Sequence, residues 1–276
     1  MAIKEKIKSY KHSKIKDMRL DTFISKALNS YHGFKKPIGK TKDFITSPEI
    51  SQMFGEIIGL YIYHIWKTKI NSKFNLIELG PGKGTLFEDI NRSVSKYPDF
   101  INKAKVSFIE VNRELIKIQK KSIKKLNYNN VNWRNSINFK TNIPSIIYSN
   151  EFFDCFPVRQ FILRENWFEK FVSFNNINNN YYFKEKKVTD KKLLCLLKKY
   201  KKEKVLEVSF DRNKYFEKIC KLIKKNGGLF LTIDYGYLKN NNNFTLQSIQ
   251  NHKFTNVLEN IGDQDISSHV NFEDLI

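Results

Sequence analysis

Cysteine is scarce in this 276-residue sequence, and this excludes two classes of small protein. The three cysteines, Cys155, Cys195 and Cys220, are odd in number and lack the close paired spacing of a zinc site or a disulfide framework. The five histidines do not cluster with them, so we expect no metal site. Free thiols in this pattern are typical of a reducing compartment.

Long apolar runs are also lacking. The longest apolar stretch, residues 57–66, is far shorter than the roughly 20 residues that span a bilayer. The start of the chain is rich in lysine and has no apolar segment of the kind that a secretory signal contains. We therefore expect a soluble intracellular protein without a transmembrane segment.

Acidic residues are few relative to basic ones, with 28 Asp and Glu against 49 Lys and Arg, and the formal net charge is +21. Such an excess raises affinity for anions, including nucleic acid. The lysines are nevertheless spread along the chain among asparagines, as an AT-rich genome produces. Charge alone therefore assigns no function.

Hydrophobic residues make up 41% of the chain and aromatic residues 14%, which is enough for a packed core. A basic tail and a short helix over 20–28 come first. Ser47 and Pro48 then suit the start of a stronger helix. Apolar residues recur at three- and four-residue steps in this helix and predict one apolar face, made of Ile50, Met53, Phe54, Ile57, Ile58, Tyr61 and Ile65.

Short apolar strands alternate with helices downstream of residue 66. This alternation predicts an α/β fold whose sheet is mostly parallel, with helices on both faces. The predicted strands are 75–79, 106–111, 130–134, 145–149 and 229–235, and the helices are 86–97, 113–125 and 215–225.

A second pattern interrupts the parallel one. Segments 158–163, 167–174 and 181–184 alternate like antiparallel strands, and the parallel pattern resumes at 205–209. We therefore predict an N-terminal tail and helical cap over 1–66, and a core over 67–276 with a β-rich insertion at about 158–204.

The motif Glu78-Leu79-Gly80-Pro81-Gly82-Lys83-Gly84-Thr85 lies between a predicted strand and a helix. Glycine there permits positive φ and close approach of the backbone to a bound nucleoside. A dinucleotide fold prefers its third glycine one position later. The tighter spacing fits S-adenosylmethionine, and the acidic Glu78 suits the cationic amino-acid end of this cofactor.

Three further acidic groups follow predicted strands, and in an open parallel sheet these strand ends border the ligand crevice. Glu110 ends the second strand and can accept hydrogen bonds from both ribose hydroxyls. Glu151 and Asp154 follow the fourth strand, where methyltransferases hold the methyl acceptor, and a carboxylate there could bind a guanidinium bidentately. Asp234 lies at the end of the last strand and ranks below them.

Four segments together resemble the signatures of the MidA-like methyltransferases. They are residues 43–52 (DFITSPEISQ), 78–85 (ELGPGKGT), 150–154 (NEFFD) with Pro157-Val158, and 234–236 (DYG). The later segments 245–247 (TLQ), His252 and 265–272 (DISSHVNF) also resemble this family. The resemblance runs from about Leu20 to the end of the sequence.

The resemblance implies a class I methyltransferase fold with S-adenosylmethionine as the methyl donor. The mitochondrial member of the family is an arginine methyltransferase that serves complex I assembly. The resemblance therefore implies a subunit of the respiratory NADH dehydrogenase as the substrate. The implied compartment is the cytoplasm of a bacterial-type cell or the mitochondrial matrix of a eukaryote. The residues carried over are Glu78, Gly80, Gly82, Gly84, Glu110, Asp43 and Thr46 for the cofactor, and Glu151 and Asp154 for catalysis.

The sequence departs from the family at Lys42, Asn271 and the C-terminus, where family members continue for several tens of residues. We expect the first two changes to be tolerated and the missing stretch to hold closing antiparallel strands. Two alternatives stay open: a catalytically impaired, S-adenosylmethionine-binding assembly factor from a truncated gene, and, less favoured, a nucleic-acid methyltransferase.

Overall fold

The computed structural model describes residues 17–34, 47–126, 131–200, 202–239 and 242–276. The chain forms two compact units. The first unit comprises residues 1–31, 154–212 and 236–276, and the second comprises 32–153 and 213–235. The chain thus passes between the units four times. These bounds differ from the domain boundaries expected from the sequence, and those boundaries stay a prediction.

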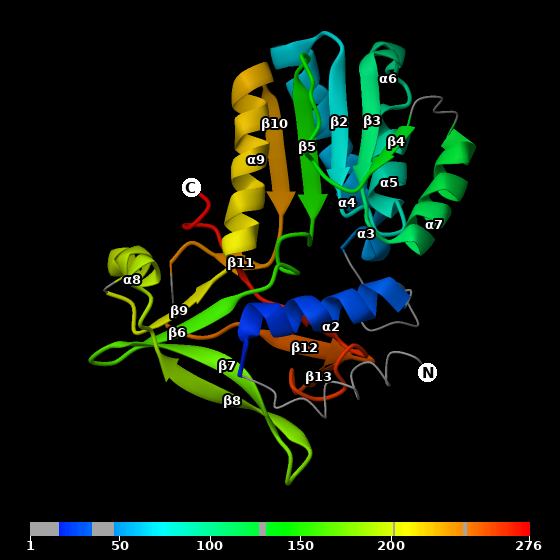
Figure 1. Ribbon diagram of the computed structural model, residues 1–276. Helices are drawn as coiled ribbons and strands as arrows, with labels where there is room; N and C mark the ends of the chain where they lie inside the picture. The colour runs from blue at the N-terminus through cyan, green and yellow to red at the C-terminus, as the bar shows by residue number, and fades with distance from the viewer. Residues whose placement is uncertain (1–16, 35–46, 127–130, 201, 240–241) are drawn as a thin grey trace. The chain divides into compact units, whose positions relative to one another are not determined.

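A five-stranded parallel sheet forms the centre of the second unit, in the order β10-β5-β2-β3-β4 (Figure 1). All five strands were expected within a few residues of their observed bounds. They are β2 (Phe74–Leu79), β3 (Ala104–Ile109), β4 (Val131–Arg134), β5 (Ser145–Asn150) and β10 (Gly228–Ile233). The predicted α/β class with a mostly parallel sheet is confirmed.

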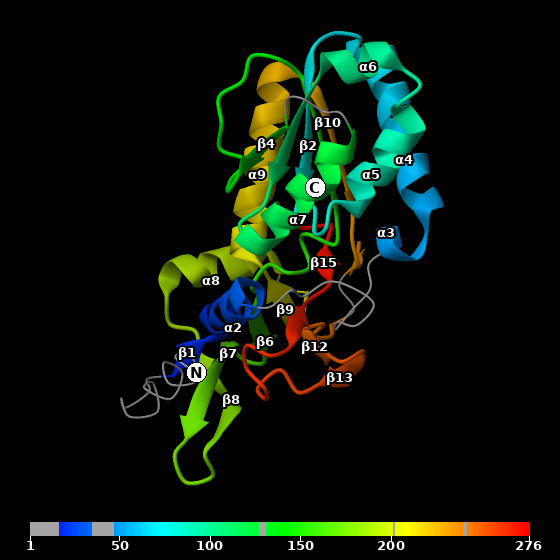
Figure 2. The same cartoon turned by 90° about the vertical axis from the view of Figure 1, so that its right-hand side faces the viewer.

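Helices cover both faces of this sheet, as expected (Figure 2). One face carries α4 (Gln52–Ile65), α5 (Thr85–Val94) and α6 (Pro98–Lys103), whose apolar side chains join those of β2, β3 and β5 in one core. α9 (Phe210–Asn226) covers the other face, where Phe216 stacks near Phe230 of β10 at 5.8 Å between ring centres. The remaining elements of the unit are α3 (Ser47–Ile50), the π-helix η1 (Trp66–Ile70), α7 (Arg113–Ile123) and the short η2 (Lys124–Leu126).

The buried face of α4 differs from the apolar face expected from the sequence and shares only Ile58 with it. Its buried residues are Gly55, Ile58, Gly59 and Ile62. A Cβ on Gly55 would overlap Asp89 of α5, and one on Gly59 would overlap Ser93, so the two glycines let the helices approach closely.

The expected stripe instead lies mostly on the surface. Ile50, Met53 and Ile57 are 75%, 65% and 59% exposed. The helix is also interrupted, because α3 ends at Ile50 and α4 begins at Gln52 after the extended Ser51. Hydropathy does not identify the buried face of α4, because glycine contributes little to an apolar pattern even where, as at Gly55 and Gly59, it forms the contact with the neighbouring helix.

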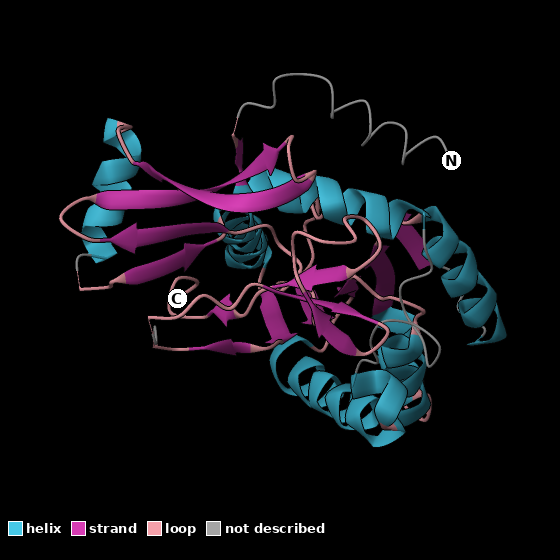
Figure 3. Cartoon of the chain, turned by 90° about the horizontal axis from the view of Figure 1, so that it is seen from below, coloured by secondary structure: helices cyan, strands magenta, loops and turns pink. Residues whose placement is uncertain are grey.

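An antiparallel sheet forms the core of the first unit (Figures 1 and 3). Its strand order is β1-β7-β6-β9, and β8 also pairs with β7, along residues 168–175. The strands are β1 (Met18–Arg19), β6 (Arg159–Leu163), β7 (Trp167–Asn175), β8 (Asn180–Lys187) and β9 (Val205–Val208). The expected β-rich segment is present, but the expectation that the parallel pattern resumes at 205–209 is wrong. β9 pairs antiparallel with β6, with Arg159 opposite Val208.

Helices and short strands complete the first unit. α2 (Leu20–Phe34) contributes buried residues such as Phe23 and Ile24 to a core with Ile266. The others are α8 (Lys191–Leu197), η3 (Lys198–Tyr200), β11 (Gly236–Tyr237), β12 (Gln247–Gln250), β13 (Lys253–Thr255), β14 (Asp265–Ser267) and β15 (Val270–Asn271). Within the described ranges, no helix is long and apolar enough to cross a membrane.

Candidate cofactor and acceptor site

The predicted site residues of the second unit gather at one edge of the parallel sheet. β2, β3 and β5 end at Leu79, Ile109 and Asn150. These ends are followed directly by the glycine turn (residues 80–84), Glu110 and Glu151. Because the strands are parallel and adjacent, their carboxyl ends share an edge. Asp43 and Thr46, also predicted for the cofactor, lie outside the described residues.

The glycine turn adopts the conformation that its sequence requires. Gly80, Gly82 and Gly84 have φ values of +62°, +57° and +90°, all in the left-handed region that disfavours side chains. A Cβ on Gly80 would lie 2.8 Å from the ring of Phe152. The turn is therefore fixed both by its φ values and by the space around it, and it opens directly into α5 at Thr85.

The segment preceding α4 contacts this turn through an ion pair. Lys83 Nζ lies 2.8 Å from Glu49 Oε1, and the Glu49 side chain is only 10% exposed. Its second oxygen, Oε2, is buried and has no hydrogen-bond partner among the described residues. Glu49 thus fixes one end of α3 on the turn and is a residue that the sequence did not single out for the cofactor.

Glu78 is buried inside β2, at 3% exposed. The Tyr148 hydroxyl donates a hydrogen bond to its Oε2 at 3.1 Å. Burial raises the pKa of Glu78 to about 8, the Tyr148 hydrogen bond opposes the rise, and the charge of Glu110 adds to it. Near neutral pH this carboxyl group is therefore mostly protonated.

Glu110 is also buried, at 9% exposed, but its surroundings differ. The backbone N–H groups of Val111 and Asn112 donate to its Oε1, each at 2.8 Å. Gln119 Nε2 donates to its Oε2 at 3.3 Å. Burial raises the pKa of Glu110, while these three donors lower it. Glu110 is thus a buried carboxyl group with both oxygens engaged by N–H donors.

Gln119 is a site residue that the sequence reasoning missed. Its side chain is fully buried, and its amide bridges Glu110 to the glycine turn by donating to the Gly82 carbonyl at 2.7 Å. A signal was available: Gln119 lies four residues after Leu115 and four before Ile123, both of which are buried. A polar side chain on the apolar stripe of a helix is a position to examine.

Glu151 occupies a strained turn after β5. Its φ is +50°, which is uncommon for a residue other than glycine. Asp234 holds this turn in place, because its Oδ2 accepts from the backbone N–H groups of Phe152 at 3.1 Å and Phe153 at 2.8 Å. Asn150 Nδ2 donates to Glu151 Oε1 at 3.1 Å. Asp234, ranked low from the sequence, therefore acts on the backbone beside Glu151.

Asp154 belongs to the other compact unit, where it opens the segment 154–212. Its backbone carbonyl accepts from Ser268 N–H at 3.0 Å within that unit. The predicted catalytic role of Asp154 beside Glu151 stays a prediction.

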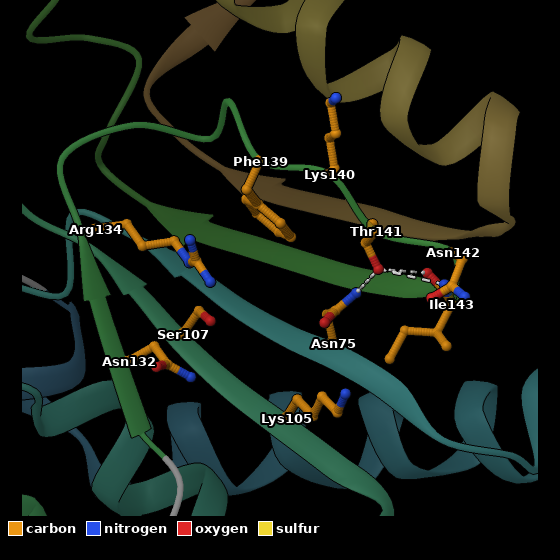
Figure 4. Close-up of a pocket in the computed structure, with 10 residues that line it drawn as sticks. All are labelled: Asn75, Lys105, Ser107, Asn132, Arg134, Phe139, Lys140, Thr141, Asn142 and Ile143. Carbon is orange, nitrogen blue, oxygen red and sulfur yellow. Dashed lines mark hydrogen bonds between the residues drawn. The ribbon is translucent and has the colours of Figure 1, made fainter.

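A polar cavity of about 190 Å³ lies elsewhere on the parallel sheet (Figure 4). The β4–β5 connection contains no helix among its described residues, and its loop covers this face of the sheet. Figure 4 shows Asn132 and Arg134 of β4 beside Ser107 of β3, with Phe139 of the loop next to them. None of the predicted site residues lines this cavity, and among the described residues no cluster of His, Cys, Asp or Glu could hold a metal.

The chain matches the family described as "Putative S-adenosyl-L-methionine-dependent methyltransferase" over residues 57–276. It belongs to this family. The match includes the glycine turn, Glu110, Glu151 and Asp234, and it confirms the family resemblance seen in the motifs.

Several proteins that are similar in sequence to this chain carry a more specific name. The mitochondrial protein arginine methyltransferase NDUFAF7 homolog of Caenorhabditis elegans is 29% identical over 92% of this chain and 65% of its own length. The mitochondrial protein arginine methyltransferases NDUFAF7 of Danio rerio and Homo sapiens are 29% and 27% identical. They are covered over 61% and 62% of their lengths, so the chain spans less than two thirds of these relatives.

A solved structure shares the fold. It is a "likely methyl transferase" from Burkholderia thailandensis bound to S-adenosyl-homocysteine, with a TM-score of 0.76 and 18% identity. The similarity covers 94% of this chain and 70% of that one. This likeness confirms the predicted methyltransferase-type architecture.

Proposed function

We propose that this chain is an S-adenosylmethionine-dependent protein arginine methyltransferase. The observation that carries the proposal is the pairing, at the carboxyl edge of the parallel sheet, of a glycine turn in left-handed conformation with a buried, hydrogen-bonded Glu110. The names of the NDUFAF7 relatives support arginine as the acceptor.

The residues of the turn and its neighbours fit such a cofactor. The positive φ values of the three glycines keep Cβ atoms out of the turn, and Glu110 is a hydrogen-bond acceptor suited to a ribose diol. Glu78 would face the cationic amino-acid end, and Gly82 and Gly84 would line the turn. Asp43 and Thr46 remain proposed cofactor residues on the family resemblance alone.

When bound, the cofactor supplies an electrophilic methyl group on a sulfonium. The residues of the chain then have to orient the acceptor and receive charge. We propose that Glu151 binds the acceptor guanidinium, directs one nitrogen at the methyl group, and favours loss of the proton released from that nitrogen. Asp154 is proposed as its partner in catalysis.

A protein substrate follows from arginine as the acceptor. A subunit of the respiratory NADH dehydrogenase is the substrate that we propose, with a role in complex I assembly. The relatives are named mitochondrial. We propose the mitochondrial matrix in a eukaryotic host and the cytoplasm in a bacterial one.

Methyl transfer can be tested with the purified chain, donor labelled on the methyl group, and an extract of the host's respiratory membranes. We expect label on arginine of a complex I subunit, and a loss of at least about a hundredfold in Glu151→Gln. Glu165→Gln, at an exposed position in the other unit, is the matched control and should keep full activity. Cofactor binding without any transfer would reject the enzyme and favour the assembly-factor alternative.

A further inference from the structure

Gln119 lies on α7, and its side-chain amide makes three hydrogen bonds. Nε2 donates to the Gly82 carbonyl at 2.7 Å and to Glu110 Oε2 at 3.3 Å. Oε1 accepts from the indole N–H of Trp133 on β4 at 2.9 Å. One side chain thus joins three elements that are far apart in the sequence: the glycine turn, the end of β3 and the edge strand.

An amide at this position is not needed for packing. Gln119 is 0% exposed and shares its helix face with Leu115 and Ile123, both apolar. A buried amide costs free energy unless its hydrogen bonds are made, and an apolar residue of similar size would pack without that demand. The residue type is therefore explained by what the amide contacts.

The two groups that Gln119 contacts on its donor side are the ones assigned to the cofactor. We propose that Gln119 is a positioning residue that sets the Glu110 carboxylate and the Gly82 carbonyl in one fixed arrangement for the ribose and amino-acid parts of the cofactor. The inference rests on the proposed function, since it concerns the same site. Trp133 fixes Gln119 in turn, because its N–H determines which end of the amide faces Glu110.

The arrangement also acts on the pKa of Glu110, which burial raises and the hydrogen bond from Gln119 lowers. Its Oε1 is held by two backbone N–H groups, so Gln119 supplies the remaining donor that fixes the plane of the carboxylate. The titratable group facing it from β2 is Glu78, whose pKa is raised mainly by burial, with a further rise from the charge of Glu110. On α7, Lys120 lies over the Trp133 ring at 5.3 Å from its centre.

Titration calorimetry of the full chain with S-adenosyl-homocysteine tests the inference without any catalytic step. Gln119→Leu keeps the volume and removes the three hydrogen bonds, and we expect its Kd to rise at least about tenfold. The matched control is Gln160→Leu. Gln160 is also a buried glutamine, 2% exposed, that donates to a glutamate (Glu207 Oε2, 2.6 Å), but it belongs to the other unit. Its Kd should match the wild type.

Gln119→Glu gives a test in which one variant serves as its own folding control. At about pH 8 an ionised carboxylate would face both Glu110 and the Gly82 carbonyl, so binding should be much weaker than in the wild type. At about pH 5.5 the two carboxyl groups can share a proton, which restores a donor between them. We therefore expect the ratio of variant to wild-type Kd to fall by at least about tenfold over this range.

Trp133→Phe removes only the indole N–H donor and keeps an aromatic ring beside Phe108, which Trp133 contacts edge-on at 5.7 Å. We expect a Kd increase of about threefold to tenfold. We also expect the change in tryptophan emission on ligand binding to be present in the wild type and lost in this variant.

The outcomes separate the inference from the proposed function. If the wild type does not bind S-adenosyl-homocysteine, the proposed function fails. If the wild type binds it and both Gln119 variants bind as tightly at every pH, Gln119 is only a core residue and the inference is overturned. Weaker binding by Gln119→Leu with a flat pH response of the Gln119→Glu ratio would also overturn the positioning role, because a packing defect does not depend on protonation.

Discussion

The raised pKa of Glu78 predicts that cofactor binding releases a proton. In the free protein burial places this pKa at about 8, so about nine tenths of the molecules carry a proton on Glu78 at pH 7. A cation bound close to the carboxylate stabilises the ionised form and lowers its pKa. If the bound value falls to about 6 or below, close to one proton leaves per cofactor bound at pH 7.

Calorimetry in buffers that differ in ionisation enthalpy measures this release directly. We expect most of one proton to be released per cofactor bound at pH 7. S-adenosyl-homocysteine keeps the ammonium group but has no sulfonium. Release with both ligands assigns the effect to the amino-acid end, and release with S-adenosylmethionine alone assigns it to the sulfonium.

Glu78→Gln is the critical variant, because it keeps the shape and cannot ionise. It should bind without releasing a proton at pH 7, and Glu110→Gln identifies any release that comes from the neighbouring carboxylate. The raised pKa also makes the ionised form of Glu78 destabilising, so its contribution to stability is present below about pH 4.5 and is lost as the pH rises through about 8. Glu78→Gln should therefore flatten the fall in unfolding free energy over this range. A wild type that binds the cofactor at pH 7 with no net proton release would refute the reasoning.

Three further substitutions test the frame of the site, and a fourth serves as a control. Gly80→Ala should abolish cofactor binding, because its methyl group would meet an aromatic ring at 2.8 Å. Gly227→Ala is the control, since Gly227 has a φ of +80° and open space around it. It should cost only about 1–2 kcal/mol of stability and leave the Kd for the cofactor unchanged. Asp234→Ala removes three hydrogen bonds that backbone N–H groups donate to this carboxylate. In denaturant titrations it should lower the unfolding free energy by about 2–4 kcal/mol. In transfer assays it should reduce methyl transfer more than it reduces cofactor affinity. Glu49→Ala leaves Lys83 without its partner beside the turn. Calorimetry should show cofactor binding weakened about threefold to tenfold. An affinity equal to that of the wild type would argue that α3 has no part in the site.

The strand ends could be predicted from the sequence because their signals are local. A short apolar run followed by glycines and then by an apolar helical pattern identifies a strand, a turn and a helix within about fifteen residues. Parallel pairing then brings successive turns to one edge. Glu110 and Glu151 could therefore be placed near the glycine turn without knowing any side-chain contact, and the structure brings the elements that carry them to this edge.

Contacts between distant elements could not be read in the same way. The buried face of α4 depends on the fit of Gly55 and Gly59 against α5, which no apolar pattern records. The direction of β9 depends on its pairing with β6, and a strand of four residues has the same pattern in either direction. Gln119 lay inside a correctly predicted helix, but its role depends on two partners outside that helix.

The contrast between Glu78 and Glu110 is the part of the site that only the structure could supply. The two residues lie on one face of neighbouring strands, since Glu78 is opposite Phe108 and Glu110 follows two positions later. One side-chain hydroxyl donates to Glu78, whereas three N–H donors surround Glu110. Burial raises the pKa of both carboxyl groups, and three N–H donors oppose that rise at Glu110, against one hydroxyl at Glu78. Gln119 supplies one of those three donors, and removing it should move Glu110 toward the protonated state in which Glu78 is held. Under the proposed function, the carboxyl group that would bind the ribose therefore depends on Gln119, a residue to which we assign no contact with the cofactor.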